Sequence, residues 1–111
     1  MSSNIVRVSP WRTLGFAALT NAYQTLGTRL DHSMRVLHFI NNTNGDCAIS
    51  FDGTTDNIPV LADSFVVYDL TAAQDANEMF RYEKGTQIYV KYLTAPTEGD
   101  FYLVSIYGKG E

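Results

Sequence analysis

Hydrophobic and polar residues alternate along most of the chain in short runs, with turn-forming residues between them. The clearest run is Cys47–Phe51, in which every second residue is apolar and the residues between are small or polar. Glycine, proline, asparagine and aspartate separate the runs, as they do between strands. Further strands are expected at residues 4–8, 23–26, 34–40, 58–61, 64–70, 79–82, 87–93 and 100–107.

A series of about seven to nine short strands predicts an all-β fold, either a sandwich or a barrel. We expect a compact antiparallel β-sandwich, jelly-roll-like or immunoglobulin-like, with an N-terminal arm. The sandwich is expected to span residues 22–111, preceded by a strand and arm over residues 1–21. Pro59 is expected to place its strand at a sheet edge, because proline cannot donate to a ladder. One helical turn is expected at Thr71–Asn77.

Two apolar runs lie on either side of Asn44-Gly45. Asn-Gly at such a place favours a type I′ hairpin turn, whose two central residues both need positive φ. Met34–Ile40 and Cys47–Phe51 are therefore expected to pair as a hairpin. Met34–Ile40 and the last run, Asp100–Tyr107, are apolar on both alternating faces, unlike a strand with one solvated face. We expect the second face to be covered too, with another subunit as a candidate, which favours an assembly part over a free enzyme.

Residues Ser9–Asn21 are apolar but weakly periodic, which is consistent with a short helix or an irregular arm. An arm would bury its apolar side chains on a neighbouring subunit. The alternative is an ordinary N-terminal segment packed on its own sandwich. The candidate interface residues of the arm are Trp11, Leu14, Phe16, Leu19 and Tyr23.

Composition and charge narrow the classes of function. Charged residues make up 18% of the chain, below the average of about 25%, which suits a protein that hides part of its surface in contacts. The net charge is −4 and no basic patch forms, so direct nucleic-acid binding is not expected. No apolar stretch has the length of a membrane-spanning helix, so no membrane partner is expected. No signal peptide is recognised at the N-terminus, so we expect the protein to be made in the cytoplasm.

No group of residues has the spacing of a catalytic or metal site. Cys47, the single cysteine, excludes an internal disulfide and lies on an apolar face, where cysteines are commonly inert; His38 is the nearest candidate partner for it. His32 and His38 lack accompanying ligands. The loop Asp52–Asn57 departs from the EF-hand pattern and is expected to be a hairpin tip, with a weak calcium site as the alternative. Asp52 and Asp56 are candidates for partner contact, and no enzyme activity, cofactor or metal is expected.

Aromatic residues on the last strands suggest an alternative function. They could form a face that stacks on sugars, although strand aromatics mostly fill cores and cross-strand pairs. A glycan-binding module is therefore the alternative function. The aromatic residues concerned are Tyr89, Tyr92, Phe101, Tyr102 and Tyr107.

The order of several segments resembles small virion proteins of tailed bacteriophages, the accessory proteins of head, neck and tail. The segments are RVLHFINNTNGDCAISFDGTTD, PVLADSFVVYDL, EKGTQIYVKYL and the terminal GDFYLVSIYG, and the resemblance covers about residues 20–108. It implies a non-enzymatic structural part of the virion, made in the host cytoplasm: a capsid decoration protein or a component of the neck, collar or tail. The implied partners are further copies in a homo-oligomer and capsid, portal or tail proteins. Deletion of residues 1–21 is then expected to abolish incorporation into particles while the sandwich stays folded.

Overall fold

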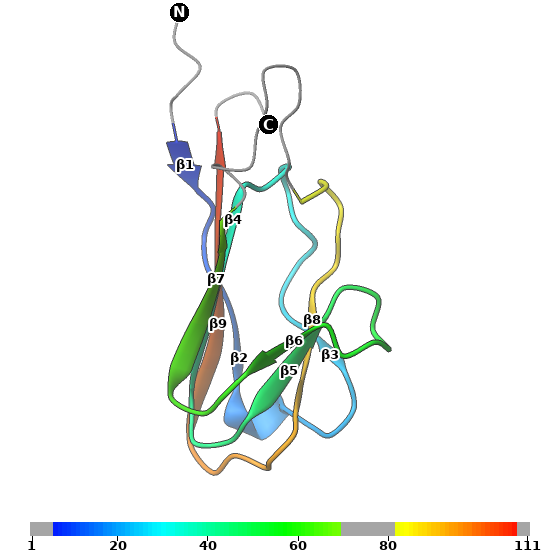
Figure 1. Cartoon of the computed structure of the whole chain (residues 1–111), viewed down its shortest axis with the longest axis vertical. Coiled ribbons are helices and arrows are strands. Elements are labelled where there is room, and N and C mark those ends of the chain that lie inside the picture. The colour runs from blue at the N-terminus through cyan, green and yellow to red at the C-terminus, as the bar shows by residue number, and fades with distance from the viewer. Residues whose placement is uncertain (1–5, 70–81, 109–111) are drawn as a thin grey trace, which may run out of the picture.

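The computed structural model describes residues 6–69 and 82–108, and these form a β-sandwich of two antiparallel sheets (Figure 1). The expected fold class is thus confirmed. Sheet A contains β1 (Val6–Val8), β2 (Arg12–Gly15), β4 (Val36–Thr43), β7 (Ser64–Asp69) and β9 (Gly99–Gly108). Sheet B contains β3 (Gln24–Thr25), β5 (Cys47–Ser50), β6 (Ile58–Val60) and β8 (Tyr89–Tyr92). A short 3-10 helix, Phe16–Ala18, follows β2.

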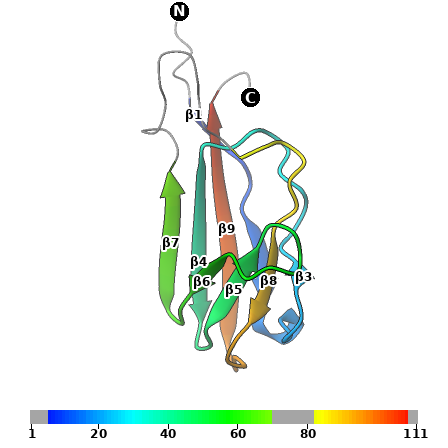
Figure 2. The same ribbon diagram turned by 45° about the vertical axis from the view of Figure 1, so that its right-hand side comes forward.

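The longest strand, β9, lies inside sheet A and pairs with other strands on both of its sides. On one side it pairs with β4 over eight residues, from Val36 opposite Ile106 to Thr43 opposite Gly99. On the other side it pairs with β1 and then with β2. The strand order is β1-β9-β4-β7, with β2 also beside β9, and Figure 2 shows β7, β4 and β9 lying side by side.

The hydrophobic core lies between the two sheets. Alternation along β4 and β9 sends every second side chain inward, and this set includes Leu37, Phe39 and Leu103, all fully buried. Sheet B and the connection before β4 supply the opposite wall. The other buried apolar residues of this core are Leu19, Leu26, Leu30, Met34, Cys47, Ile49, Ile58, Val60, Ile88, Val90 and Phe101. Burial of each large side chain stabilises the fold by about 1.5–3 kcal/mol relative to exposure.

The hairpin prediction is wrong. β4 pairs with β7 and β9, whereas β5 pairs with β6 and β8, so Met34–Ile40 and Cys47–Phe51 lie in different sheets. Neither Asn44 nor Gly45 has a positive φ. Gly45 is required for another reason: a Cβ at this position would overlap the carbonyl oxygen of Thr94. The Asn-Gly pair therefore turns the chain from sheet A into sheet B.

Buried polar groups hold this sheet-to-sheet turn. Asn41 takes the inward position after Phe39 on β4, and its Nδ2 donates to the carbonyl oxygens of Gly45 (2.8 Å) and Val60 (2.9 Å). Its Oδ1 accepts from the backbone N–H (3.0 Å) and the hydroxyl (2.7 Å) of Thr43. The chain leaves sheet A inside the protein, where backbone groups lose their strand partners. The Asn41 amide provides hydrogen bonds to these buried groups instead.

The remaining strand predictions can be compared with the described residues. The runs at 4–8, 23–26, 58–61, 64–70, 87–93 and 100–107 each contain a strand, and β6 with Pro59 is an edge strand as expected. The helical turn predicted at Thr71–Asn77 lies outside the described residues, as does most of the run at 79–82, of which Tyr82 forms a bridge to Met34. Within the described part, no helix is long and apolar enough to cross a membrane.

The N-terminal segment is part of the sandwich where the structure describes it. β2 pairs with β9 from Arg12 opposite Leu103 to Gly15 opposite Asp100, and Leu19 belongs to the core. This agrees with the alternative of a segment packed on its own domain. Deletion of residues 1–21 would remove β1, β2 and the core residue Leu19, so we now expect it to destabilise the sandwich as well as to prevent incorporation into particles.

Candidate functional site

The side of sheet A that faces away from sheet B is mainly apolar. The register sets His38 of β4 beside Val104 of β9 and Val67 of β7, and Ile40 beside Tyr102 and Phe65. Neighbouring side chains in such pairs share one face of the sheet. We call the apolar part of this surface the outer face. Trp11 belongs to it because the next residue, Arg12, lies opposite the inward-facing Leu103. Its residues are Val8, Trp11, Val36, His38, Ile40, Phe65, Val67, Tyr102, Val104 and Ile106, and the register sets the polar Thr13, Asn42, Asp69 and Asp100 on the same side of the sheet.

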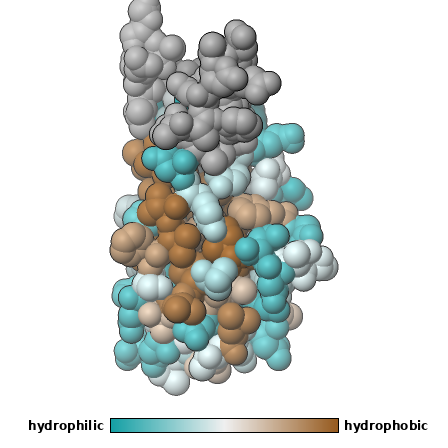
Figure 3. All heavy atoms as spheres, viewed as in Figure 1, coloured by the Kyte–Doolittle hydropathy of each residue, from teal (hydrophilic) through white to brown (hydrophobic). Residues whose placement is uncertain are grey.

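The rim of the outer face is strongly exposed, and its centre is half-buried by neighbouring side chains. Val8 (63%), Trp11 (67%), Phe65 (64%) and Val67 (45%) are among the most exposed large hydrophobic residues of the described chain. In Figure 3, most of the hydrophobic residues visible lie over the half of the molecule that sheet A occupies. A solvated antiparallel sheet usually carries polar residues on such a face, whereas this one carries mainly apolar residues.

His38 lies near the centre of the outer face and has an unusual environment. Its ring meets that of Phe65 edge-on, with centroids 5.2 Å apart and planes at 70°. Its Nε2 is buried and has no hydrogen-bond partner among the described residues. A buried polar atom without a partner costs free energy, so the position of this nitrogen lowers the stability of the isolated domain.

The structure separates the candidate interface residues that the sequence suggested. Trp11 and Phe16 are exposed, whereas Leu14 packs against the core and Leu19 is buried in it. Trp11 alone belongs to the outer face. The others, Tyr23, Asp52 and Asp56, lie in or beside the loop between β5 and β6.

Tyr23 and Asp56 are brought together although 33 residues separate them. The Tyr23 hydroxyl donates to Asp56 Oδ1 (2.5 Å), and Lys91 Nζ lies 3.1 Å from the same oxygen and 4.7 Å from the Tyr23 ring centroid. Partial burial, and then the bond to Asp56, raise the pKa of Tyr23; the bond from Tyr23, and then Lys91, lower the pKa of Asp56. This cluster ties the loop to β8 and the segment before β3.

The carboxylate of Asp52 organises its own loop. It accepts from the backbone N–H groups of Thr55 (2.8 Å) and Thr54 (2.9 Å) and from the hydroxyls of Thr55 and Ser50. These bonds hold its pKa well below the usual range. The donors around Asp52 indicate a structural loop at the tip of the β5–β6 hairpin, as the sequence predicted. Among the described residues, no group of three or more metal-ligating side chains occurs.

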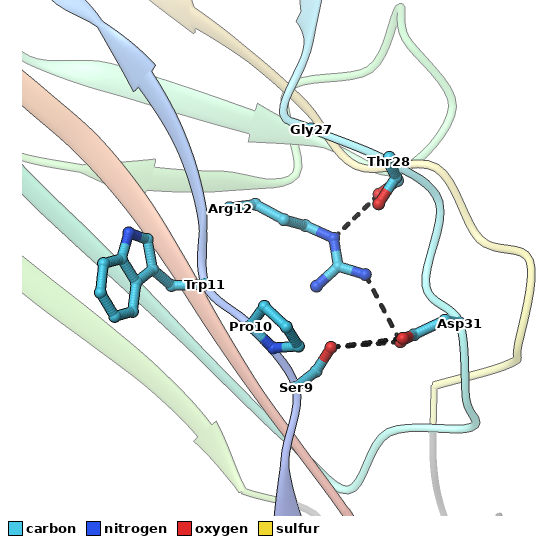
Figure 4. A pocket seen from close by; sticks show the side chains of 7 residues that line it. All are labelled: Ser9, Pro10, Trp11, Arg12, Gly27, Thr28 and Asp31. Atoms are coloured by element: carbon cyan, nitrogen blue, oxygen red, sulfur yellow. Dashed lines mark hydrogen bonds and ion pairs between the residues drawn. The ribbon is translucent and has the colours of Figure 1, made fainter.

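A cleft of about 270 Å³ lies where the N-terminal segment meets residues 27–31 (Figure 4). Two charged residues, Arg12 and Asp31, line it, and Arg12 is 7% exposed and is used by the fold. The guanidinium donates to the carbonyl oxygens of Thr28 (2.9 Å) and Arg29 (3.1 Å) and to the Ser105 hydroxyl (3.1 Å), and lies 3.6 Å from Asp31. The Trp11 ring points away from the cleft (Figure 4), and Asp31, although half exposed, accepts from the Ser9 hydroxyl (3.2 Å) and lies beside Arg12, so these groups serve contacts within the fold.

The structure does not bring the other suggested chemistry together. Cys47 is fully buried in the core, where burial raises the pKa of its thiol to about 11, and His38 faces the opposite side of sheet A. His32 stacks on Tyr107 with ring centroids 3.8 Å apart.

The five aromatic residues that were predicted to form a sugar-binding face do not share one face in the structure. Phe101 is in the core, Tyr102 is on the outer face, Tyr107 packs against the core, and Tyr89 and Tyr92 are in sheet B. The aromatic residues that do gather on one surface are Trp11, Phe65 and Tyr102. In the sequence, the two-sided apolar runs at residues 34–40 and 100–107 indicate this surface, and so does SFVVYDL, whose apolar residues do not alternate with polar ones.

Comparison of the chain with protein-family models, with curated proteins and with solved structures finds no match.

Proposed function

We propose that this chain is a non-enzymatic structural component of a tailed-bacteriophage virion, and that it is assembled into the particle through the outer face of sheet A. The observation that carries the proposal is the apolar outer face itself, which no second layer of the described chain covers. Self-contained antiparallel sheets keep one face on the core and the other polar. Here the outward side of the larger sheet is mainly apolar, with polar residues such as Thr13, Asn42 and Asp100 beside the outer face.

The size and composition of the outer face suit a protein contact. Four strands abreast and about six residues along each give roughly 400 Å² of sheet surface, within the range of patches that are often functional. Trp11, Phe65 and Tyr102 are of the types enriched at interfaces.

The virion context comes from the order of the sequence segments, which resembles that of small virion proteins of tailed bacteriophages. The proposed role is that of a repeated part: a capsid decoration protein or a component of the neck, collar or tail. Low charge and the absence of a gathered catalytic group in the described residues agree with such a role. The proposed partners are further copies of the chain and capsid, portal or tail proteins.

The test uses a phage whose copy of this gene is deleted and is supplied from a plasmid. Mass spectrometry of purified particles should find the 12.4 kDa chain at a fixed ratio to the capsid protein. Trp11→Lys should be lost from particles, because the charge has to be dehydrated at the contact. Leu93→Lys is the matched control, since Leu93 is also exposed (52%) but lies after β8, away from the outer face.

Particles that never contain the wild-type chain would overturn the virion proposal. Wild-type incorporation of Trp11→Lys would instead show that a different surface is used for assembly.

A further inference from the structure

The edges of the two sheets differ in their protection against pairing with another strand. Sheet B ends at β6, which carries Pro59, and at β3, which is two residues long. The β1–β2 side of sheet A is interrupted at Ser9-Pro10, between two short strands. Proline, short length and interruption are the usual devices that prevent edge-to-edge association.

The remaining edge, β7, has none of these devices. It runs for six residues, SFVVYD, with no proline, glycine or lysine. Phe65 (64%), Val67 (45%) and Tyr68 (38%) are exposed along it, and β4 is its partner on one side only among the described residues. A long, flat and hydrophobic edge strand is a template for another strand.

The register shows which backbone groups of β7 point outward. Asp63 N–H donates to the Thr43 carbonyl, so the odd-numbered residues of β4 direct their backbone groups toward β7. These residues pair with even-numbered residues of β7. Because successive residues of a strand bond to opposite sides, the N–H and C=O of Phe65 and Val67 point to the free edge. The same two residues place their side chains on the outer face.

We propose that β7 pairs with β7 of a second copy of this chain, antiparallel about a two-fold axis, so that the two A sheets become one continuous sheet. A second copy is the occupant that the edges favour, because its other three edges are protected and its β7 is not. The pairing satisfies the outward groups of both strands at once. It is also isologous, so it closes at a dimer and does not continue into a fibre.

Strand length selects the register of this pairing. A two-fold axis at Val66 would extend the paired stretch to Asp63, which lies outside β7 and has a φ of 55°, so it cannot continue an extended ladder. An axis at Val67 sets Val67 opposite Val67 of the second copy and keeps the paired residues 65–69 within β7. The dimer then joins the two outer faces into roughly 800 Å² of apolar surface, the area that one partner buries in a standard interface. The use of this joined surface rests on the proposed function, whereas the pairing itself does not need a particle.

The first experiment measures the mass of the purified full-length chain by light scattering across a range of concentrations. The wild type should give twice the 12.4 kDa of one chain. Val67→Pro should give a folded monomer, because it removes an N–H that faces the free edge and leaves the β4 ladder intact. Val67→Ala is the matched control: it shortens the same side chain but keeps the N–H, and it should stay a dimer.

The second experiment decides the result even where Val67→Pro fails to fold. Mild oxidation of Val67→Cys should link two chains, since directly opposite residues have Cα atoms about 5.5 Å apart, within disulfide range. Phe65→Cys should give no linked dimer, because an axis at Val67 separates its two copies by four residues along the strands. The wild type, whose Cys47 is buried, controls for other links.

A wild-type monomer at every concentration, a dimer that survives Val67→Pro, or linkage through Phe65→Cys and not Val67→Cys would each overturn the proposed pairing. Trp11→Lys should remain a dimer while it is lost from particles, so a failure of the pairing is distinguished from a failure of the virion role.

Discussion

Asn41 and Gly45 are joined by a hydrogen bond at the point where the chain passes from one sheet to the other: Asn41 Nδ2 donates to the Gly45 carbonyl oxygen over 2.8 Å. The same amide also donates to the Val60 carbonyl oxygen and accepts from the Thr43 N–H, and the Asn41 residue is only 1% exposed. A single side chain thus replaces the ladder bonds that the backbone gives up at this crossing.

Replacing Asn41 should be strongly destabilising. Asn41→Ala leaves the Val60 carbonyl and the Thr43 N–H buried with fewer partners, and we expect a loss of about 2–4 kcal/mol in the free energy of unfolding. Urea denaturation followed by circular dichroism measures it. Asn42→Ala, at the next and exposed position, should change stability by no more than about 0.5 kcal/mol. Equal effects of the two substitutions would contradict the role given to the Asn41 amide.

Gly99 and Gly85 provide a matched pair that separates backbone strain from close packing. Both have positive φ (94° and 92°), so alanine at either position carries a strain of about 1–2 kcal/mol. At Gly99 a Cβ would also overlap the Asn42 carbonyl oxygen, whereas at Gly85 it would meet nothing within 4 Å. Thermal or urea unfolding should therefore show Gly99→Ala to be much less stable than Gly85→Ala. Similar stabilities would mean that the β4–β9 contact is looser than described.

Arg12 should not be replaceable by lysine. Three of its nitrogens donate to Thr28, Arg29 and Ser105, and an ammonium on a flexible stem cannot reproduce that planar arrangement. We expect Arg12→Lys to lower the free energy of unfolding by about 2–4 kcal/mol. Arg7→Lys, at an exposed position of β1, should be close to neutral in the same assay. A neutral Arg12→Lys would show that the loop at residues 27–31 does not depend on the guanidinium.

Asp52 should make stability depend on pH in the acid range. Its pKa is lowered in the folded protein by hydrogen bonds from Thr55 and Thr54, while in the unfolded chain it lies near the usual value of about 3.9. Its contribution is therefore present in full above about pH 4 and is lost as the pH falls below that value.

Unfolding of Asp52→Asn at a series of pH values tests this sign. The variant should be less stable than the wild type at pH 7, and the difference should shrink toward pH 2. Glu98→Gln, which removes one charge from the exposed β8–β9 loop, is the control and should give a difference that does not follow this course.

Strand positions could be predicted from the sequence because they depend on local patterns. Alternation at Cys47–Phe51 and the turn residues around each run fix where strands begin and end, and Pro59 identified an edge. Partners could not be assigned in the same way. The Asn44-Gly45 signal is local, but the sheet that receives the next strand depends on Asn41 reaching Val60 and on Thr94 lying against Gly45, and both contacts are remote in sequence.

The sequence predicts only part of the candidate surface. Two-sided apolar runs correctly indicated that β4 and β9 have apolar residues on both faces, but not that they are neighbours. Among the proposed interface residues only Trp11 lies on the outer face. The weak periodicity around Leu14 and Leu19 predicts an arm, whereas in the structure Leu19 is part of the core and Leu14 packs against it.

The pairing of β9 with β1, β2 and β4 also sets the order in which the protein can form during synthesis. Residues 6–15 have no partner strand until residues 99–108 exist, and β4 lacks one of its two neighbours until then. A nascent chain can pair β4 with β7 early, but sheet A cannot be completed until β9 has left the ribosomal exit tunnel, because β1 and β2 pair only with β9 among the described strands.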